Sequence, residues 1–144
     1  MAKLLSILSD PSASWSRRQP AAEESIQSLT ASCDFALPEE YLSFLRYSNG
    51  GEGSLCIEPW YFQLCPAEEV GAYNSGYNVG KFLPGYLAIG SNDGGEMLAI
   101  RKRDGSPCPV YMVPFIPMAE SDAVQIASDF ETFAMALGRS GGQK

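Results

Sequence analysis

The stretch LPEEYLSFLRYSNGGEG, residues 37–53, has the pattern of an amphipathic helix that ends at a glycine-rich turn. Pro38 suits a first helical turn, and the two glutamates behind it lie near the positive end of the helix dipole. The apolar residues recur at helical spacing, which predicts one buried stripe made of Leu37, Tyr41, Phe44 and Leu45.

The turn itself comprises Asn49, Gly50 and Gly51. Asparagine and glycine supply the left-handed conformation that a helix C-cap commonly uses. Phosphate-binding glycine loops precede a helix N-terminus, whereas these glycines follow a C-terminus, where the dipole has the wrong sign for an anion. We therefore expect the turn to have an architectural role, at a close backbone approach between helix and sheet.

Two shorter helices are expected before this segment. Residues 2–9 have the apolar content for one, and residues 12–19 form a connector that Trp15 anchors. A second helix begins near Pro20, with Ile26 and Leu29 facing inward.

After residue 53 the pattern shortens into strands separated by turn residues. SLCIE and WYFQLC form a first pair, YLAIG and EMLAIRKR form a hairpin that turns near Asp93-Gly94, and PVYMVPF is the last strand. Residues 66–80 begin as a short helix and continue as a polar, glycine-containing loop.

A final helix is expected over residues 128–138. Ser128 and Glu131 have capping-box spacing, Phe130 and Phe133 share a face, and Gly138 stands at the C-cap position. The fold class is therefore α+β, a single domain whose central antiparallel-rich sheet is flanked by N-terminal helices and a C-terminal helix. We divide the chain into residues 1–19, an N-terminal helix and connector packed on the domain, the domain itself at residues 20–138, and a flexible tail at residues 139–144.

Composition excludes several kinds of chemistry. The 144 residues contain no histidine, so catalytic triads with histidine, Cys-His pairs and histidine metal sites are impossible. The four cysteines form no C-x-x-C pair, and we expect no metal, no cofactor and no catalytic residue. The net charge of −7 disfavours nucleic acid, and the absence of a signal peptide or a long apolar run predicts a cytoplasmic protein without a membrane partner.

Three stretches together resemble the SUKH superfamily, the SMI/KNR-type domain. Residues 37–53 match its Leu-Pro, Tyr-x-x-Phe-Leu and Asn-Gly-Gly signature. YLAIGSNDGGEMLAI is similar to its hairpin with a Gly94-Gly95 turn, and IASDFETFAMAL is similar to its closing helix with Phe130 and Phe133. Glu96 stands where this hairpin commonly carries Asp, which leaves the subfamily open.

The resemblance implies a non-catalytic α+β domain built for recognition. Many bacterial members are immunity proteins that bind and neutralise toxin domains, and other members are regulatory or scaffold proteins. A third reading is a small-ligand or carboxylate-based enzyme domain, with Tyr61, Tyr86 and Glu96 in a pocket on the sheet. We take the immunity protein as the leading hypothesis.

The charge distribution suggests where a partner binds. Residues 20–70 contain nine acidic residues and one base, Arg46. The following segment AYNSGYNVG has the tyrosine-rich composition of recognition loops, although an ordinary surface loop explains it equally well. The hypothesis is that a basic toxin domain docks on a patch that contains Trp60, Tyr61, Glu68, Glu69, Tyr73 and Tyr77.

Overall fold

The computed structural model describes residues 2–11, 13–33, 35–103 and 107–139. Its strands form one antiparallel sheet in which each strand pairs with the next along the chain, in the order β1 to β7. The strands are β1 (Trp15–Arg17), β2 (Gly51–Ser54), β3 (Tyr61–Leu64), β4 (Tyr86–Ser91), β5 (Glu96–Arg101), β6 (Val110–Pro114) and β7 (Val124–Ala127). The expected α+β class with an antiparallel sheet is confirmed.

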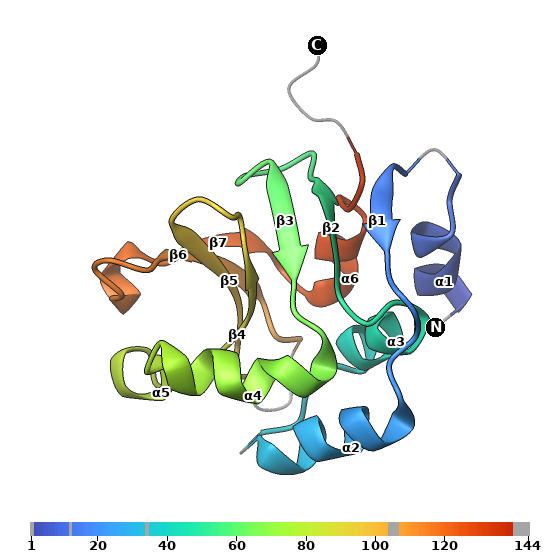
Figure 1. The fold of residues 1–144 in the computed structure, drawn as a ribbon. Helices are drawn as coiled ribbons and strands as arrows, with labels where there is room; N and C mark the ends of the chain where they lie inside the picture. The colour runs from blue at the N-terminus through green and yellow to red at the C-terminus, as the bar shows by residue number, and fades with distance from the viewer. Residues whose placement is uncertain (1, 12, 34, 104–106, 140–144) are drawn as a thin grey trace.

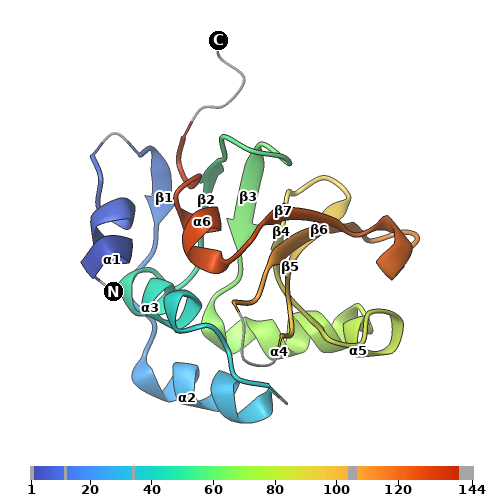
Figure 2. The same ribbon diagram turned by 180° about the vertical axis from the view of Figure 1, so that it is seen from behind.

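Helices lie on both faces of this sheet. Among the described residues they are α1 (Ala2–Leu8), α2 (Glu23–Ser32), α3 (Glu39–Tyr47), α4 (Ala67–Gly76), α5 (Val79–Phe82) and α6 (Phe130–Ala134), with a 3-10 turn η1 (Glu120–Asp122). Seen from behind, α1, α3 and α6 cover the half of the sheet formed by β1, β2 and β3 (Figure 2). Helices α4 and α5 lie next to β4 on the other face of the sheet, along the bottom of the view in Figure 1.

The main core lies between the sheet and the layer of α1, α3 and α6. The predicted stripe of α3 is confirmed, because Leu37, Tyr41, Phe44 and Leu45 are all buried. Phe130 and Phe133 of α6 are fully buried and complete this core. A second, smaller cluster packs α5 against the other face through Val79, Leu83, Ala88, Met97 and Val113.

The glycine turn after α3 differs in detail from the expectation. The helix ends at Tyr47 with an extended Ser48 as its C-cap, and the positive φ angles belong to Gly50 (+92°) and Gly51 (+143°), not to Asn49. A Cβ atom on Gly50 would lie 2.5 Å from the carbonyl oxygen of Leu64. The glycines therefore permit the close approach that the sequence predicts, while Asn49 has a different role, described below.

The hairpin turn is confirmed. Residues 92–95 connect β4 to β5, and Asp93 has a positive φ of 58°. The side-chain oxygen of Asn92 accepts hydrogen bonds from the backbone N–H groups of Gly94 and Gly95 at 2.9 and 3.1 Å. One polar side chain thus satisfies the donors of the turn.

The connector before α2 contains a strand that the sequence reading missed. Trp15 begins β1, which pairs with Gly51–Gly53 of β2. Its ring centroid lies 5.7 Å from that of Phe44 and 6.0 Å from that of Phe62. Burial of this one aromatic side chain explains why a polar segment joins the sheet.

Other boundaries need correction. SLCIE is not a strand, because β2 is Gly51–Ser54, and Leu55 forms only an isolated bridge with Leu137. Helix α2 begins at Glu23 rather than near Pro20, with Ile26 and Leu29 buried as expected. Helix α6 is capped by Asp129, whose carboxylate accepts from Thr132 N at 2.7 Å, so the expected box at Ser128 is off by one residue.

The two ends of the described chain meet beside β1. The backbone N–H of Ser14 donates to the carbonyl of Gly138 at 2.7 Å, and Arg139 forms an ion pair with Asp10 at 2.9 Å. Residue 139, the first of the expected flexible tail, is therefore in contact with the domain. The remainder of that tail, residues 140–144, lies outside the described residues.

Candidate partner-binding face

One face of the β1–β3 half of the sheet carries no helix of the described residues (Figure 1). Side chains alternate along β3, so the buried Phe62 and Leu64 face the helical layer, while the half-exposed Tyr61 and Gln63 point the other way. Residues paired across neighbouring strands share a face. This open sheet face consists of Ser16, Glu52, Ser54, Tyr61, Gln63 and Ser91.

A polar cleft lies where the open sheet face meets α4. Its volume is about 220 Å³, and its polar lining comes from Arg18, Gln63, Cys65, Glu69, Tyr73 and Ser91. The half-buried Tyr73 donates a hydrogen bond to the carbonyl of Gly90 at 3.2 Å. The cleft therefore joins a tyrosine and a carboxylate of α4 to the strands.

Helix α4 is held against the sheet by two asparagine side chains. Asn74 donates to the carbonyl of Ala88 at 2.9 Å and accepts from its N–H at 2.8 Å, so its amide pairs with β4 as a neighbouring strand would. Asn49 accepts from the N–H of Ala67 at 2.7 Å and donates to the Glu68 carboxylate at 3.0 Å. These contacts fix the first turn and the C-terminal half of the helix.

The same contacts overturn the expected polar loop. Residues 71–76 continue α4, and Val79–Phe82 form α5, although glycine, asparagine and serine are weak helix formers. The amide of Asn74 also donates to the carbonyl of Val70 at 2.8 Å. Tertiary hydrogen bonds to the sheet outweigh the low helix propensity of this segment.

Burial raises the pKa of two side chains that line the polar cleft, Cys65 and Tyr73. Burial, together with the nearby Glu69 charge, raises the pKa of the Cys65 thiol to about 11. Burial raises the pKa of Tyr73 to about 12. A reactive cysteine or a tyrosine base needs a lowered pKa, so neither Cys65 nor Tyr73 is activated for that chemistry.

Two residues of the enzymatic alternative, Tyr86 and Glu96, lie at opposite ends of the β4–β5 hairpin. Tyr86 opens β4 opposite Arg101, whereas Glu96 opens β5, at the other end of this hairpin. Glu96 accepts from Asn92 Nδ2 at 2.9 Å, and Tyr61 belongs to the open sheet face. Within the described ranges no carboxylate is buried and no group of three metal-ligating side chains occurs.

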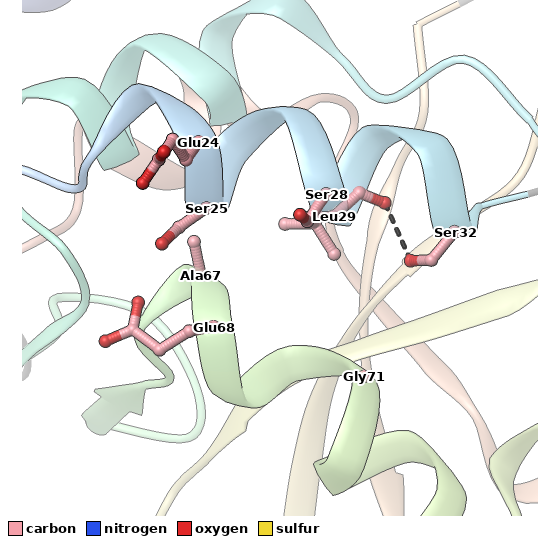
Figure 3. A pocket seen from close by; sticks show the side chains of 8 residues that line it. All are labelled: Glu24, Ser25, Ser28, Leu29, Ser32, Ala67, Glu68 and Gly71. Carbon is pink, nitrogen blue, oxygen red and sulfur yellow. Dashed lines mark hydrogen bonds between the residues drawn. The ribbon is translucent and has the colours of Figure 1, made fainter.

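A second groove separates α2 from α4 and receives Glu68. Its volume is about 320 Å³, and Figure 3 shows Glu24 and Glu68 at the same end of it. Ser25, Ser28 and Ser32 line its α2 side, where Ser32 donates to the carbonyl of Leu29 at 2.8 Å. Glu68 therefore points toward α2, away from the polar cleft that Glu69 lines.

An apolar groove at the C-terminal end of α4 was not anticipated from the sequence. It measures about 480 Å³ and is lined by Tyr77, Phe82, Phe115, Ile116, Pro117 and Met118. Ile116 is 91% exposed, Phe82 50% and Tyr77 46%. The signal was present in the apolar run 115–118 just after β6, but its exposure depends on the position of α5.

The structure thus gathers only part of the predicted patch. Glu69 and Tyr73 line the polar cleft, and Tyr61 lies on the adjoining open sheet face. Tyr77 belongs to the apolar groove, although its ring contacts that of Tyr73 with centroids 5.2 Å apart. Trp60 is half-exposed in the β2–β3 turn, where it has a positive φ of 74°.

Sequence comparison with known proteins identifies the family of this chain. Among curated proteins, no sequence matches this chain. None of the helices in the described residues has the length and apolar composition needed to cross a bilayer. The sequence model of the SMI1 / KNR4 family (SUKH-1) matches residues 20–135, from the segment before α2 to the end of α6. The chain therefore belongs to the SMI1 / KNR4 family (SUKH-1).

Proposed function

We propose that the protein is a non-catalytic binding module, and most concretely an immunity protein that binds and neutralises a bacterial toxin domain. The family match over residues 20–135 carries this proposal, because SUKH proteins are commonly immunity proteins and are generally non-catalytic. The raised thiol and phenol pKa values in the polar cleft are consistent with a site that binds rather than reacts.

The proposed contact region is the open sheet face together with α4. Glu69 and Tyr73 are one helical turn apart on α4, so they form one stripe beside Tyr61 and Gln63. Rigid attachment of α4 through Asn49 and Asn74 favours binding, since little ordering entropy is lost on association. Trp60 and Glu68 flank this region from the β2–β3 turn and the α2 groove.

A basic partner fits the charges of this region. Glu23 and Glu39 each contact Arg46 at 3.2 Å, whereas Glu24, Glu68 and Glu69 form no ion pair with any described residue. Exposed carboxylates of this kind accelerate the encounter with a basic surface, while the tyrosines supply contact area. A nuclease toxin has such a basic surface, because its substrate is a polyanion.

Genetic rescue tests the proposal. Any toxin domain found to be encoded beside this gene is expressed with and without the protein, and we expect survival only with it. Purified protein should form a complex whose association rate falls as salt rises. The absence of both rescue and complex formation with the neighbouring toxin would overturn the immunity role, whereas complex formation without rescue would favour a regulatory or scaffold role.

Two charge-reversal variants test whether the partner binds at the open sheet face and α4. Glu69→Lys, in the polar cleft, should slow association and weaken neutralisation. Glu40→Lys makes the same charge change on α3, away from the open sheet face, and serves as the matched control. Equal effects of the two substitutions would place the binding surface elsewhere.

A further inference from the structure

We infer that the apolar groove at the end of α4 receives a large apolar side chain from the basic protein partner, so that it anchors the complex. This inference rests on the proposed function, and it assigns a separate subsite to it. The groove is formed by Tyr77 and Phe82 on one side and by Phe115, Ile116, Pro117 and Met118 on the other.

Ring contacts hold the Tyr77 and Phe115 part of the groove in place. The ring of Tyr77 lies 4.6 Å from that of Phe115 and 5.2 Å from that of Tyr73, measured between centroids. Tyr73 is in turn bonded to the carbonyl of Gly90 on β4. Met118 adds a flexible side chain that adapts to the shape of an incoming group.

Two apolar side chains of the groove remain exposed to water in the folded domain. Core side chains lose contact with water, yet Ile116 is 91% exposed and Phe82 is 50% exposed. Both side chains line the same groove. A contiguous group of exposed apolar side chains on a protein surface commonly marks an interaction site. The dimensions suit one large aliphatic or aromatic side chain.

Charge favours a basic partner over a second copy of this chain. The protein carries a net charge of −7, and the exposed Asp122 follows the groove closely in sequence. Glu120 forms an ion pair with Arg101 at 2.9 Å, and the ammonium group of Lys81 lies 5.4 Å from the centroid of the Phe82 ring. A symmetric pair of molecules joined here would bring together two chains that each carry a net charge of −7, which is unfavourable. A basic partner is instead attracted by this net charge and by the exposed carboxylates of Glu68 and Glu69 on α4.

The groove is also within reach of the carboxylates at the start of α4. Ten residues separate Ala67 from Gly76, so the helix is about 15 Å long at the usual rise. An interface of ordinary size, about 800 Å² on each partner, spans that distance. A partner that covers α4 therefore presents basic groups to Glu68 and Glu69 and an apolar anchor to the groove.

The experiment uses a defined probe, a synthetic amphipathic helical peptide of lysine and leucine. Its binding is followed by NMR through the methyl signals of Ile116 and Met118 in the full chain. We expect these signals to shift and the Ile116→Ser/Phe82→Ser variant to bind at least tenfold more weakly, as loss of an anchor contact predicts, about 1.4 kcal/mol. Met135→Ser is the matched control, because Met135 is 51% exposed on a different surface.

Two further peptides separate the contributions of charge and apolar contact. Replacement of leucine by alanine should abolish the methyl shifts, and replacement of lysine by glutamate should weaken binding at least tenfold. Unchanged affinity of the groove variant, or equal binding of the glutamate peptide, would overturn the inference. Concentration-dependent dimerisation that Ile116→Ser abolishes would also overturn it, in favour of a second copy.

The neighbouring toxin distinguishes this inference from the proposed function. If the wild type and the groove variant neutralise the toxin and bind it with equal Kd, the anchor fails while the immunity role stands. If the peptide binds in the groove but the toxin forms no complex, the immunity role fails while the subsite stands.

Discussion

The ring of Tyr41 lies edge-on against Phe130, with centroids 5.3 Å apart, and its buried hydroxyl has no hydrogen-bond partner among the described residues. A buried polar group without a partner destabilises the fold by about 1–3 kcal/mol. The complete burial of this hydroxyl also raises the pKa of Tyr41. The contact between α3 and α6 is therefore less stable than the packing of its rings allows.

Tyr41→Phe should accordingly raise the free energy of unfolding, by about 1 kcal/mol. Urea denaturation at neutral pH measures the change. Tyr73→Phe is the matched comparison, because the Tyr73 hydroxyl donates to Gly90, and its loss should lower stability by about 1 kcal/mol. A destabilised Tyr41→Phe variant would mean that the hydroxyl has a partner in solution.

Asn49→Ala should destabilise the protein by about 1–2 kcal/mol, because it removes the acceptor for the first turn of α4. The loss should appear as a lower urea midpoint and as faster amide hydrogen exchange in residues 67–70. Asn49→Asp keeps the acceptor but places a carboxylate beside Glu68, so we expect an intermediate loss that shrinks as salt rises. Equal stability of wild type and Asn49→Ala would contradict this role.

Gly50→Ala should destabilise by about 1–3 kcal/mol, since φ is +92° and the new Cβ would meet the Leu64 carbonyl. Thermal unfolding gives the comparison. Gly71→Ala serves as control, because a Cβ there meets nothing within 4 Å, and alanine in α4 should raise stability by up to about 1 kcal/mol. A change in stability of the same sign for both substitutions would refute the role given to Gly50.

The two tryptophans should respond differently to truncation. Trp15→Ala removes a ring packed between Phe44 and Phe62 and should cost about 3–5 kcal/mol. Trp60→Ala removes a half-exposed ring and should change stability by less than about 1 kcal/mol. Chemical denaturation of both variants checks the ranking, and comparable losses would mean that β1 is not tied to the core through Trp15.

The free energy of unfolding should decrease as the pH rises above 9. Cys65 has its pKa raised from 9.0 to about 11 in the folded protein, so the unfolded chain releases this proton first. The contribution of the protonated Cys65 thiol to the free energy of unfolding is fully present below pH 9 and is lost as the pH rises toward 11. Under reducing conditions, Cys65→Ser should therefore show a smaller decrease in urea midpoint between pH 8 and 10.5 than the wild type. Parallel profiles would contradict the raised pKa.

Strong local patterns predicted the α3 stripe, the β4–β5 hairpin and the class of the fold. The hairpin followed from Asp93-Gly94, and α3 from apolar spacing that only one buried face satisfies. By contrast, β1 and the second half of α4 depend on Trp15 and Asn74, whose partners are distant in sequence. Local propensity contains no information about such contacts.

The partner-binding patch stays a prediction, and the structure brings only some of its residues together. Glu69 and Tyr73 line the polar cleft, and Tyr61 lies on the adjoining open sheet face. Trp60 and Glu68 point to other surfaces, because strand alternation and helix rotation separate residues that are neighbours in sequence. The apolar groove required the relative placement of α5 and the segment after β6, which no single stretch encodes.

The contact between Ser14 and Gly138 affects how the domain is made on the ribosome. Synthesis delivers α1 and β1 more than 100 residues before the backbone that receives Ser14 and the guanidinium that pairs with Asp10. Until then, Leu4, Leu8 and Trp15 lack part of their surroundings. The fold therefore cannot be completed progressively from its N-terminal end, and nascent chains of this protein should need protection of these apolar groups until residue 138 leaves the exit tunnel.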